Sequence, residues 1–329
     1  MSNRTYSASW IRKLTSRMGR PVPAAPASSS LSDDTLRIWE AAESLPMSDF
    51  FESRLKDLVA VCKRELPDVD EAMIRTAYAL AHWAHRDDLR KSGEPYFEHP
   101  VEVAFIVARD IHFDDTCVAA ALLHDVVEDN RQITVDHIRE LFGDTLAKIV
   151  DGVTKMEREF ESREVRQAEN FRKLLLSMAT DIRVILVKFG DRLHNMRTIS
   201  VLPERKRYKI ATETQALFAP LAHRFGLYSI KNELEDLCLK VLDPDKYHKI
   251  ANALAAKKTE RELYVKSFIG PLRRKLKKNK FDFEIYGRSK HIYSIYRKMR
   301  RQNKEIDEIY DLFAIRIIIN SEGRRGKED

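Results

Sequence analysis

The chain has 329 residues, 43% of them hydrophobic, so it can fill the cores of two domains and is neither a mini-protein nor a disordered tail. Its formal net charge of +7 favours anionic partners such as nucleotides, RNA or acidic protein surfaces, without choosing among them. Cys62, Cys117 and Cys238 are far apart and form no CxxC pair, which argues against a disulfide framework and a zinc ribbon and favours the reducing cytoplasm, and no apolar stretch is long enough to span a bilayer.

Residues 1–45 have the composition of a mobile extension. The segment "GRPVPAAPASSSLSDD" is rich in proline, serine and alanine, and cannot bury enough surface to offset chain entropy. From residue 46 to 242 the pattern is helical almost throughout, with glycine and proline mostly at breaks such as "KSGEPY", "LFGD" and "LPERKR". We therefore expect one all-helical domain over residues 46–242.

The pattern of apolar and charged residues changes over residues 243–329. A charged helical connector is followed by "FDFEIYG", which alternates like a strand, and by "IYDLFAIRIIIN", which has the pattern of a buried strand. We expect a second domain of the α+β type to begin here and to be incomplete at Asp329. The predicted fold class is mainly α, with an all-helical domain followed by the start of an α+β domain.

Four titratable residues close the apolar run "ALLHDVVEDN": His124, Asp125, Glu128 and Asp129. On a helix, residues four apart share a face, so His124 is paired with Glu128 and Asp125 with Asp129. Buried without partners beside "VAAALL", these groups would together cost several kcal/mol. A bound metal explains the four residues better than separate caps or salt bridges do.

Two further residues are suited to the same metal. His99 lies in "YFEHP" at the start of a helix, and Asp191 lies in "VKFGDRLHNMRT" between an apolar run and a His-Asn pair. Two imidazoles and two carboxylates suit manganese, iron or zinc, with positions left for water and substrate. Such a site would be catalytic, whereas ordinary structural roles account for His85 and His194.

Several motifs together resemble one known family. "HDVVED", "AHRDDLRKSGEPYFEHP" and "GDRLHNMRT" resemble the hydrolase domain of the RelA/SpoT homologue family, the alarmone enzymes, within the HD superfamily of metal-dependent phosphohydrolases. The similarity continues through "FAPLAHRFGLYSIKNELEDLCLKVL" into "YGRSKHIYSIYRKM" and "IYDLFAIRII", where the nucleotidyltransferase-like synthetase domain of that family begins. It covers residues 50 to 319 or so, and implies a bifunctional hydrolase and synthetase ancestry.

The resemblance implies roles for individual residues. The manganese ligands of the family fall on His99, His124, Asp125 and Asp191. Its acidic pair, which orients or activates the attacking water, falls on Glu128 and Asp129. Its guanine-nucleotide pocket falls on Arg90, Lys91, Ser92, Tyr96 and Asn195. One departure is Asp88, which stands where the family usually has glutamine.

The implied reaction is manganese-dependent removal of the 3′-pyrophosphate from guanosine tetra- or pentaphosphate, (p)ppGpp, giving GDP or GTP and pyrophosphate in stringent-response alarmone turnover. In the synthetase-like part, the resemblance places Arg288, Lys290 and Ser294 on the donor phosphates and Asp311 on Mg²⁺. Because the remaining motifs come later in the synthetase domain, we expect these 329 residues to hydrolyse the alarmone without making it, and Mg²⁺ to matter only in a completed domain.

Two alternatives stay open at this point. Another HD phosphohydrolase would act on a deoxynucleotide or a cyclic nucleotide. A regulatory module would instead sense a nucleotide, or would dock a ribosome or another partner through the basic stretch "PLRRKLKKNK". We expect contact with a ribosome in a full-length form of the protein. Turnover would separate an enzyme from a module, and we expect no membrane partner in either case.

Overall fold

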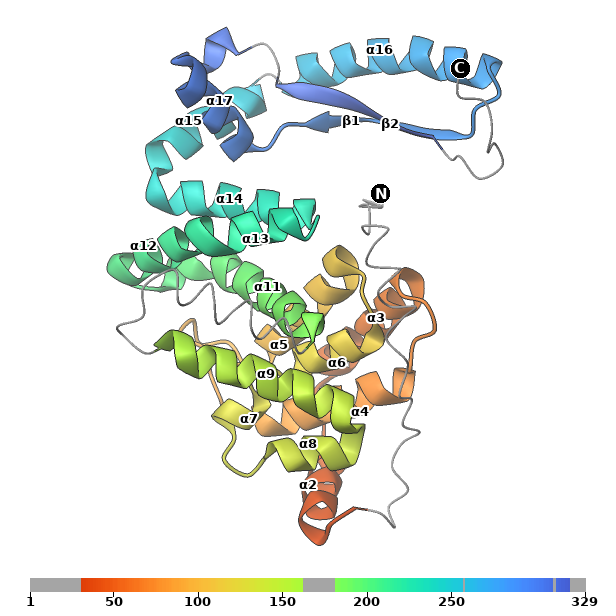
Figure 1. Cartoon of the computed structure of the whole chain (residues 1–329), viewed down its shortest axis with the longest axis vertical. Coiled ribbons are helices and arrows are strands. Elements are labelled where there is room, and N and C mark those ends of the chain that lie inside the picture. Colours follow the sequence, from red (N-terminus) through yellow and green to blue (C-terminus); the bar gives the residue numbers. More distant parts are fainter. Residues whose placement is uncertain (1–30, 162–180, 257, 310–311, 320–329) are drawn as a thin grey trace. The chain divides into compact units, whose positions relative to one another are not determined.

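The computed structural model describes residues 31–161, 181–256, 258–309 and 312–319. The chain divides into two compact units, Met1–Leu234 and Glu235–Asp329 (Figure 1). In the described residues the first unit is helical and the strands belong to the second, which confirms the mainly α fold. The expected domain boundary after residue 242 lies at the end of helix α14 (Tyr228–Leu242), and the two units divide within that helix.

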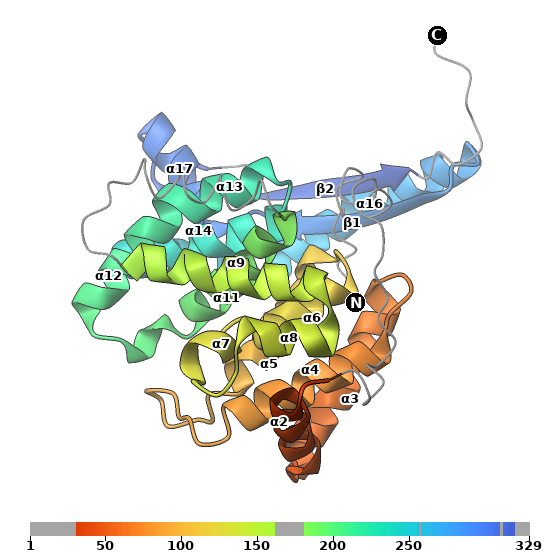
Figure 2. The same ribbon diagram turned by 60° about the horizontal axis from the view of Figure 1, so that its bottom comes forward.

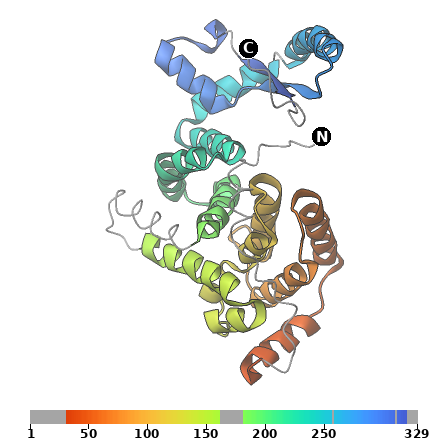
Figure 3. The same cartoon turned by 45° about the vertical axis from the view of Figure 1, so that its right-hand side comes forward.

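Residues 33–44, which we expected to belong to a mobile extension, instead form helix α2 (Asp33–Ser44) at the outer edge of the first unit (Figure 3). The Ser32 hydroxyl accepts the backbone N–H of Thr35, and two acidic residues in the first turn complement the helix dipole. The helix packs on α4 (Glu71–Ala84) and buries Thr35 and Ala42. Capping and packing therefore order a segment whose composition suggested disorder.

Helix α6 (Asp115–Leu123) is the centre of the first unit. Its residues from Cys117 to Leu123 are all buried, as expected for a helix that is apolar on every side. It packs against α4, α5 (Glu98–Ile106), α9 (Asp144–Glu161) and α11 (Ile182–Arg197), and Figure 2 shows α9 and α11 side by side. The residues that follow its carboxyl end are consequently placed deep among four other helices.

A glycine allows α11 to approach α5 closely. A Cβ atom added at Gly190 would lie 3.2 Å from Val103 Cγ1 and 3.3 Å from Val107 Cγ2, tighter than ordinary van der Waals contact. Gly190 immediately precedes Asp191, and Val103 lies one helical turn after His99. The small residue therefore lets two predicted site residues come together.

The other elements of the first unit surround this core. They are α3 (Asp49–Glu65), the π-helix η2 (Val107–Ile111), α7 (Val126–Asp129), α8 (Val135–Phe142), the 3₁₀-helix η3 (Ile199–Val201), α12 (Glu204–Glu213), the π-helix η4 (Thr214–Phe218) and α13 (Ala219–Arg224). None of the helices in these described stretches is both long and apolar enough to cross a membrane. Cys62, Cys117 and Cys238 are buried, and none of them forms a disulfide.

The second unit contains α15 (Pro244–Ala256), α16 (Lys258–Lys278), β1 (Phe283–Ser289), α17 (Ile292–Gln302), the 3₁₀-helix η5 (Ile306–Glu308) and β2 (Phe313–Ile319). The strands pair antiparallel, and a small core forms around Ile250, Ile295 and Met299. Both predicted strands are thus confirmed. The expectation that the second is buried is wrong at Ile317 and Ile319, which are 39% and 49% exposed because the described sheet has only these two strands.

Candidate active site

His124 and Asp125 lie at the junction of two helices. His124 is the C-cap residue of α6, and Asp125 is the N-cap residue of α7. Both are buried, and His124 Nε2 lies 3.1 Å from Asp125 Oδ1. The change of direction between the helices lets two adjacent residues, which diverge on a straight helix, face the same point.

His99 and Asp191 reach this point from α5 and α11. His99 Nε2 lies 3.4 Å from Asp191 Oδ1 and 3.7 Å from Asp125 Oδ2. His99, His124 and Asp191 each offer one ligand atom, and all three atoms lie within 4.8 Å of one another, with Asp125 beside them. Two ligand atoms that each lie about 2.1 Å from one metal are themselves about 3–4 Å apart, so these spacings suit a shared cation. The structure thus brings together the four residues predicted as ligands.

The tautomer of His124 and the neutral form of His99 fit a metal. His124 Nδ1 lies 2.8 Å from the carbonyl oxygen of Ala121, and because a carbonyl only accepts, Nδ1 carries a proton. His124 Nε2 is then directed at the Asp125 carboxylate, where either a proton or a metal cation must lie between two atoms that otherwise repel. Burial lowers the pKa of His99 and so favours its neutral, metal-binding form.

The two carboxylates of the cluster stay ionised. Burial alone would raise the pKa of Asp191, but Lys188, 3.5 Å away, and the histidines hold it well below its usual range. Without a metal, the charge and the hydrogen bond of a protonated His124 ring likewise outweigh burial and lower the pKa of Asp125. A cation bound in the same place would keep Asp125 ionised in the same way. Anionic oxygens beside neutral imidazoles form the mixed donor set that divalent transition metals prefer.

Tyr96 and Asn195, predicted to bind substrate, also contact the carboxylates of the cluster. Burial, together with the charge of Asp125, raises the pKa of Tyr96, so its hydroxyl keeps its proton and donates to Asp125 Oδ2 at 2.6 Å. Asn195 donates its amide to Asp191 Oδ1 at 2.5 Å. Both residues therefore orient a carboxylate, and both also line the neighbouring cavity.

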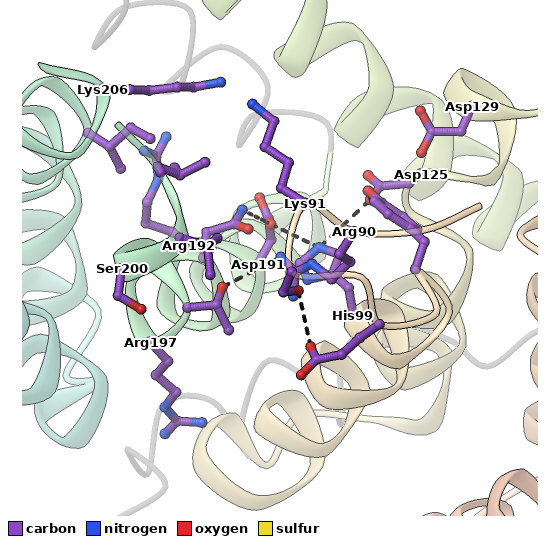
Figure 4. Close-up of a pocket in the computed structure, with 18 of the residues that line it drawn as sticks. Arg90, Lys91, His99, Asp125, Asp129, Asp191, Arg192, Arg197, Ser200 and Lys206 are labelled. Carbon is purple, nitrogen blue, oxygen red and sulfur yellow. Dashed lines mark hydrogen bonds and ion pairs between the residues drawn. The ribbon is translucent and has the colours of Figure 1, made fainter. Parts of the chain in front are cut away.

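The cluster opens on a cavity of about 800 Å³ (Figure 4). Arg90, Lys91 and Ser92 line it from the loop between α4 and α5, where Leu89 bridges to Pro95 and Gly93 turns the chain with φ +89°. This conformation favours glycine. Three of the five residues predicted for the nucleotide pocket therefore line the same cavity as the cluster.

The facing wall was not predicted from the sequence. It contains Arg192, Arg197, Ser200 and Lys206, from α11 to α12, across the cavity from Asp125 and Asp129 (Figure 4). Arg192 is held by Glu213 at 3.1 Å and by the ring of Phe218 at 4.2 Å. Cations around the cavity suit a phosphorylated ligand. Their scattered positions form no recognisable motif in the sequence.

Glu128 and Asp129 line the cavity next to the cluster. Glu128 Oε2 is buried and makes no hydrogen bond to the described residues. The side chain of Asp129 is exposed, yet partial desolvation and the nearby charges of Asp125, Glu128 and Asp88 raise its pKa to about 6. Asp88 itself lies 3.2 Å from His85 Nδ1. One carboxylate is thus free to bind water, and the other can change protonation near neutral pH.

The synthetase-like residues belong to the second unit. Lys290 follows β1, and its backbone N–H donates to the carbonyl of Leu312, while Ser294 lies in the first turns of α17. Arg288 lies in β1, and its side chain is outside the described part of the chain, as is the whole of Asp311. Nothing in the geometry assigns these residues a role.

Comparison with known proteins gives the same two regions in the same order. Residues 77–228 match the HD domain, and residues 287–326 match the region found in RelA/SpoT proteins. The first match contains all four residues of the cluster, together with Arg90, Glu128 and the facing wall of the cavity.

Three relatives illustrate the similarity. A probable guanosine-3′,5′-bis(diphosphate) 3′-pyrophosphohydrolase of Synechocystis is 47% identical over 76% of this chain. A GTP pyrophosphokinase of Myxococcus xanthus is 44% identical over 77% of this chain. The bifunctional (p)ppGpp synthase/hydrolase SpoT of Escherichia coli K12 is 41% identical over 78% of this chain. The aligned region covers 33%, 34% and 36% of these relatives, so the chain spans about a third of their length. With both regions present in order and this identity over three quarters of its length, the chain belongs to the RelA/SpoT family.

Proposed function

We propose that this protein hydrolyses the 3′-pyrophosphate of (p)ppGpp to GDP or GTP and pyrophosphate. The observation that carries the proposal is the buried cluster of His99, His124, Asp125 and Asp191 at the wall of a cavity lined with cationic side chains. Such a site combines a place for a divalent cation with charge complementary to phosphates. The names of the Synechocystis and E. coli relatives support the same substrate and reaction.

Manganese is the cation that we propose. The two imidazoles and two carboxylates would hold it, and Tyr96, Asn195 and the Ala121 carbonyl would orient them. Bound there, it would supply Lewis acidity, activation of water and neutralisation of phosphate charge. The mixture of nitrogen and oxygen donors favours manganese, iron or zinc over calcium.

We assign the handling of water to Glu128 and Asp129. Glu128 presents a carboxylate oxygen without a hydrogen-bond partner in the described residues, so it can accept a hydrogen bond from the attacking water and take its proton. With a pKa of about 6, Asp129 can receive that proton and release it at neutral pH. The pair thus provides a base and a proton acceptor next to the cluster.

The cations of the cavity would hold the nucleotide. Lys91 and Lys206 extend into the cavity from opposite walls (Figure 4) and can offset the charge of the phosphates. Arg90 is planar and can stack on the base, while Asn195 can bind the ribose. Contact with the ribosome remains a prediction from the family resemblance. A cytoplasmic location remains a prediction from the cysteines, which form no disulfide.

The experiment is incubation of the chain with guanosine tetraphosphate and Mn²⁺, with pyrophosphate measured before and after chelation. We expect release that stops with chelator and returns with added Mn²⁺. A parallel panel of dGTP and a cyclic nucleotide distinguishes another HD phosphohydrolase. Binding without release of pyrophosphate would show a nucleotide-sensing module and would contradict the proposal.

A further inference from the structure

His194 is a buried residue next to the proposed metal site. It lies within the motif "GDRLHNMRT" but has no role in the proposed chemistry. It lies on α11, three residues after Asp191, and is 7% exposed. Its Nδ1 lies 2.7 Å from Nδ1 of His99, and the two ring centroids are 4.8 Å apart. At this distance the two nitrogens share one hydrogen bond, so one of them must donate and the other must accept.

The position of Arg90 decides which ring donates. Arg90 Nη1 lies 3.4 Å from the same Nδ1 of His194, and Nη2 lies 3.5 Å from Thr198 Oγ1. A guanidinium has only donors, so a protonated Nδ1 on His194 would bring an N–H against an N–H. His194 Nδ1 therefore accepts, and the proton of the short bond belongs to His99 Nδ1.

This assignment fixes the chemistry of His99 at its other nitrogen. A neutral imidazole with its proton on Nδ1 has a lone pair on Nε2. His99 Nε2 is the atom that lies 3.4 Å from Asp191 Oδ1 and 3.7 Å from Asp125 Oδ2, inside the cluster. The alternative tautomer would point an N–H at the metal position and would prevent coordination there.

Two contacts restrict the movement of His194. Its carbonyl accepts the Thr198 hydroxyl at 3.1 Å, and its ring is packed against His99 with an interplanar angle of 40°. A histidine partner is unusual, because metal-binding histidines mostly donate to a carboxylate or a carbonyl. Because His194 is a neutral acceptor, it adds no negative charge next to the His99 ring.

We propose that His194 is a positioning residue that holds His99 in its metal-binding tautomer, an inference that rests on the metal centre of the proposed function. His194 touches neither the metal position nor the substrate in this assignment. It acts by accepting the Nδ1 proton of His99, and any replacement that keeps an acceptor at that place should keep the function.

The test uses two substitutions in the whole chain. His194→Leu removes the acceptor with little change in volume, whereas His194→Asn keeps an oxygen near the position of Nδ1. His223→Leu is the matched control, since His223 is exposed on α13 and does not line the cavity. Mn²⁺ binding is measured by calorimetry, and folding is followed by circular dichroism and thermal unfolding.

We expect His194→Leu to weaken Mn²⁺ binding by about 10- to 100-fold, the usual effect of removing such a partner. His194→Asn should recover most of the lost affinity, and His223→Leu should bind like the unchanged chain. A purely structural role would lower the unfolding temperature of both His194 variants without rescue by asparagine. Equal Mn²⁺ affinity in His194→Leu and the unchanged chain would overturn the inference.

A second measurement does not depend on folding of the variants. In the unchanged chain with ¹⁵N-labelled histidine, nuclear magnetic resonance should show His99 protonated at Nδ1 and His194 protonated at Nε2 only. The reverse assignment would overturn the inference, whatever the activity. Conversely, a chain that shows these tautomers and binds Mn²⁺ but releases no pyrophosphate would contradict the proposed function and leave the role of His194 standing.

Discussion

Asp125 and Glu128 both lie at the cavity, but their carboxylates have different partners. The difference suggests that Asp125 binds the metal and that Glu128 activates water. Asp125 is buried, accepts the Tyr96 hydroxyl at 2.6 Å and lies beside both histidines of the cluster. Glu128 keeps a buried oxygen without a partner in the described residues. Substitutions at Asp125 and at Glu128 should therefore lower pyrophosphate release for different reasons.

Asp125→Asn should abolish pyrophosphate release and bound Mn²⁺ together, because a neutral amide replaces an anionic ligand and breaks the set of four. The helical fold should remain. Metal content measured after gel filtration, beside turnover and circular dichroism, checks this. Full activity of the variant, or activity of the unchanged chain in excess chelator, would exclude the metal mechanism.

Glu128→Gln should keep Mn²⁺ and nucleotide affinity but lower the rate by about two to four powers of ten, since an amide cannot take a proton from water. Single-turnover rates and calorimetric binding separate the two effects. If Mn²⁺ occupancy falls in parallel with the rate, Glu128 is a ligand and its assignment as base is wrong.

The raised pKa of Asp129 predicts how stability depends on pH. Its pKa is 3.8 in the ordinary case and about 6 in the folded chain, so its contribution favours folding below its ordinary pKa and is lost as pH rises through 6. In chelator, Asp129→Asn should match the unchanged chain near pH 4 and become the more stable of the two towards pH 7. Urea unfolding at both pH values measures this, and a difference independent of pH would contradict it.

At the scale of elements, the approach of α11 to α5 determines whether the cluster can form. Gly190 leaves room for Val103 and Val107, and Asp191 follows it directly. A valine at Gly190 would overfill this contact at a cost of about 1–3 kcal/mol and would move Asp191 away from His99. We expect both stability and Mn²⁺ affinity to fall in Gly190→Val.

The graded variant Gly190→Ala serves as a control for this prediction. It adds only the Cβ atom, and alanine favours helix by up to about 1 kcal/mol, which offsets part of the crowding. Its losses should be smaller than those of valine in both measurements. Losses that do not follow side-chain size would show that packing of α5 on α11 does not position Asp191.

At the scale of the whole molecule, the cluster and its cavity belong to the first unit alone. A cation that binds only the folded state stabilises it by mass action, by about 2.7 kcal/mol at a concentration 100 times the dissociation constant. Calorimetric scans with chelator and with Mn²⁺ should therefore show a shift in the transition of the first unit. An equal shift of both transitions, or no shift, would contradict this location of the metal.

Much of the fold and of the candidate site could be predicted from sequence motifs and from the periodicity of apolar residues. The helical texture, the two strands and the set His99, His124, Asp125 and Asp191 follow from local pattern, from spacing and from chemistry that rewards such residues. For α2, the signal was present but outweighed by composition: Ser32 with two following acidic residues is a helix start.

The residue types that form the cluster could be read from the sequence, because they lie in short motifs and because buried charges are costly unless a partner or a metal compensates them. Their partners across helix interfaces could not be read from it. That Tyr96 and Asn195 brace carboxylates, that Arg192 and Lys206 face the cluster, and that His194 lies against His99 all depend on contacts between helices distant in the chain. Local pattern specifies the face that a helix buries, but the partner of a single side chain across a helix interface depends on packing that no spacing encodes.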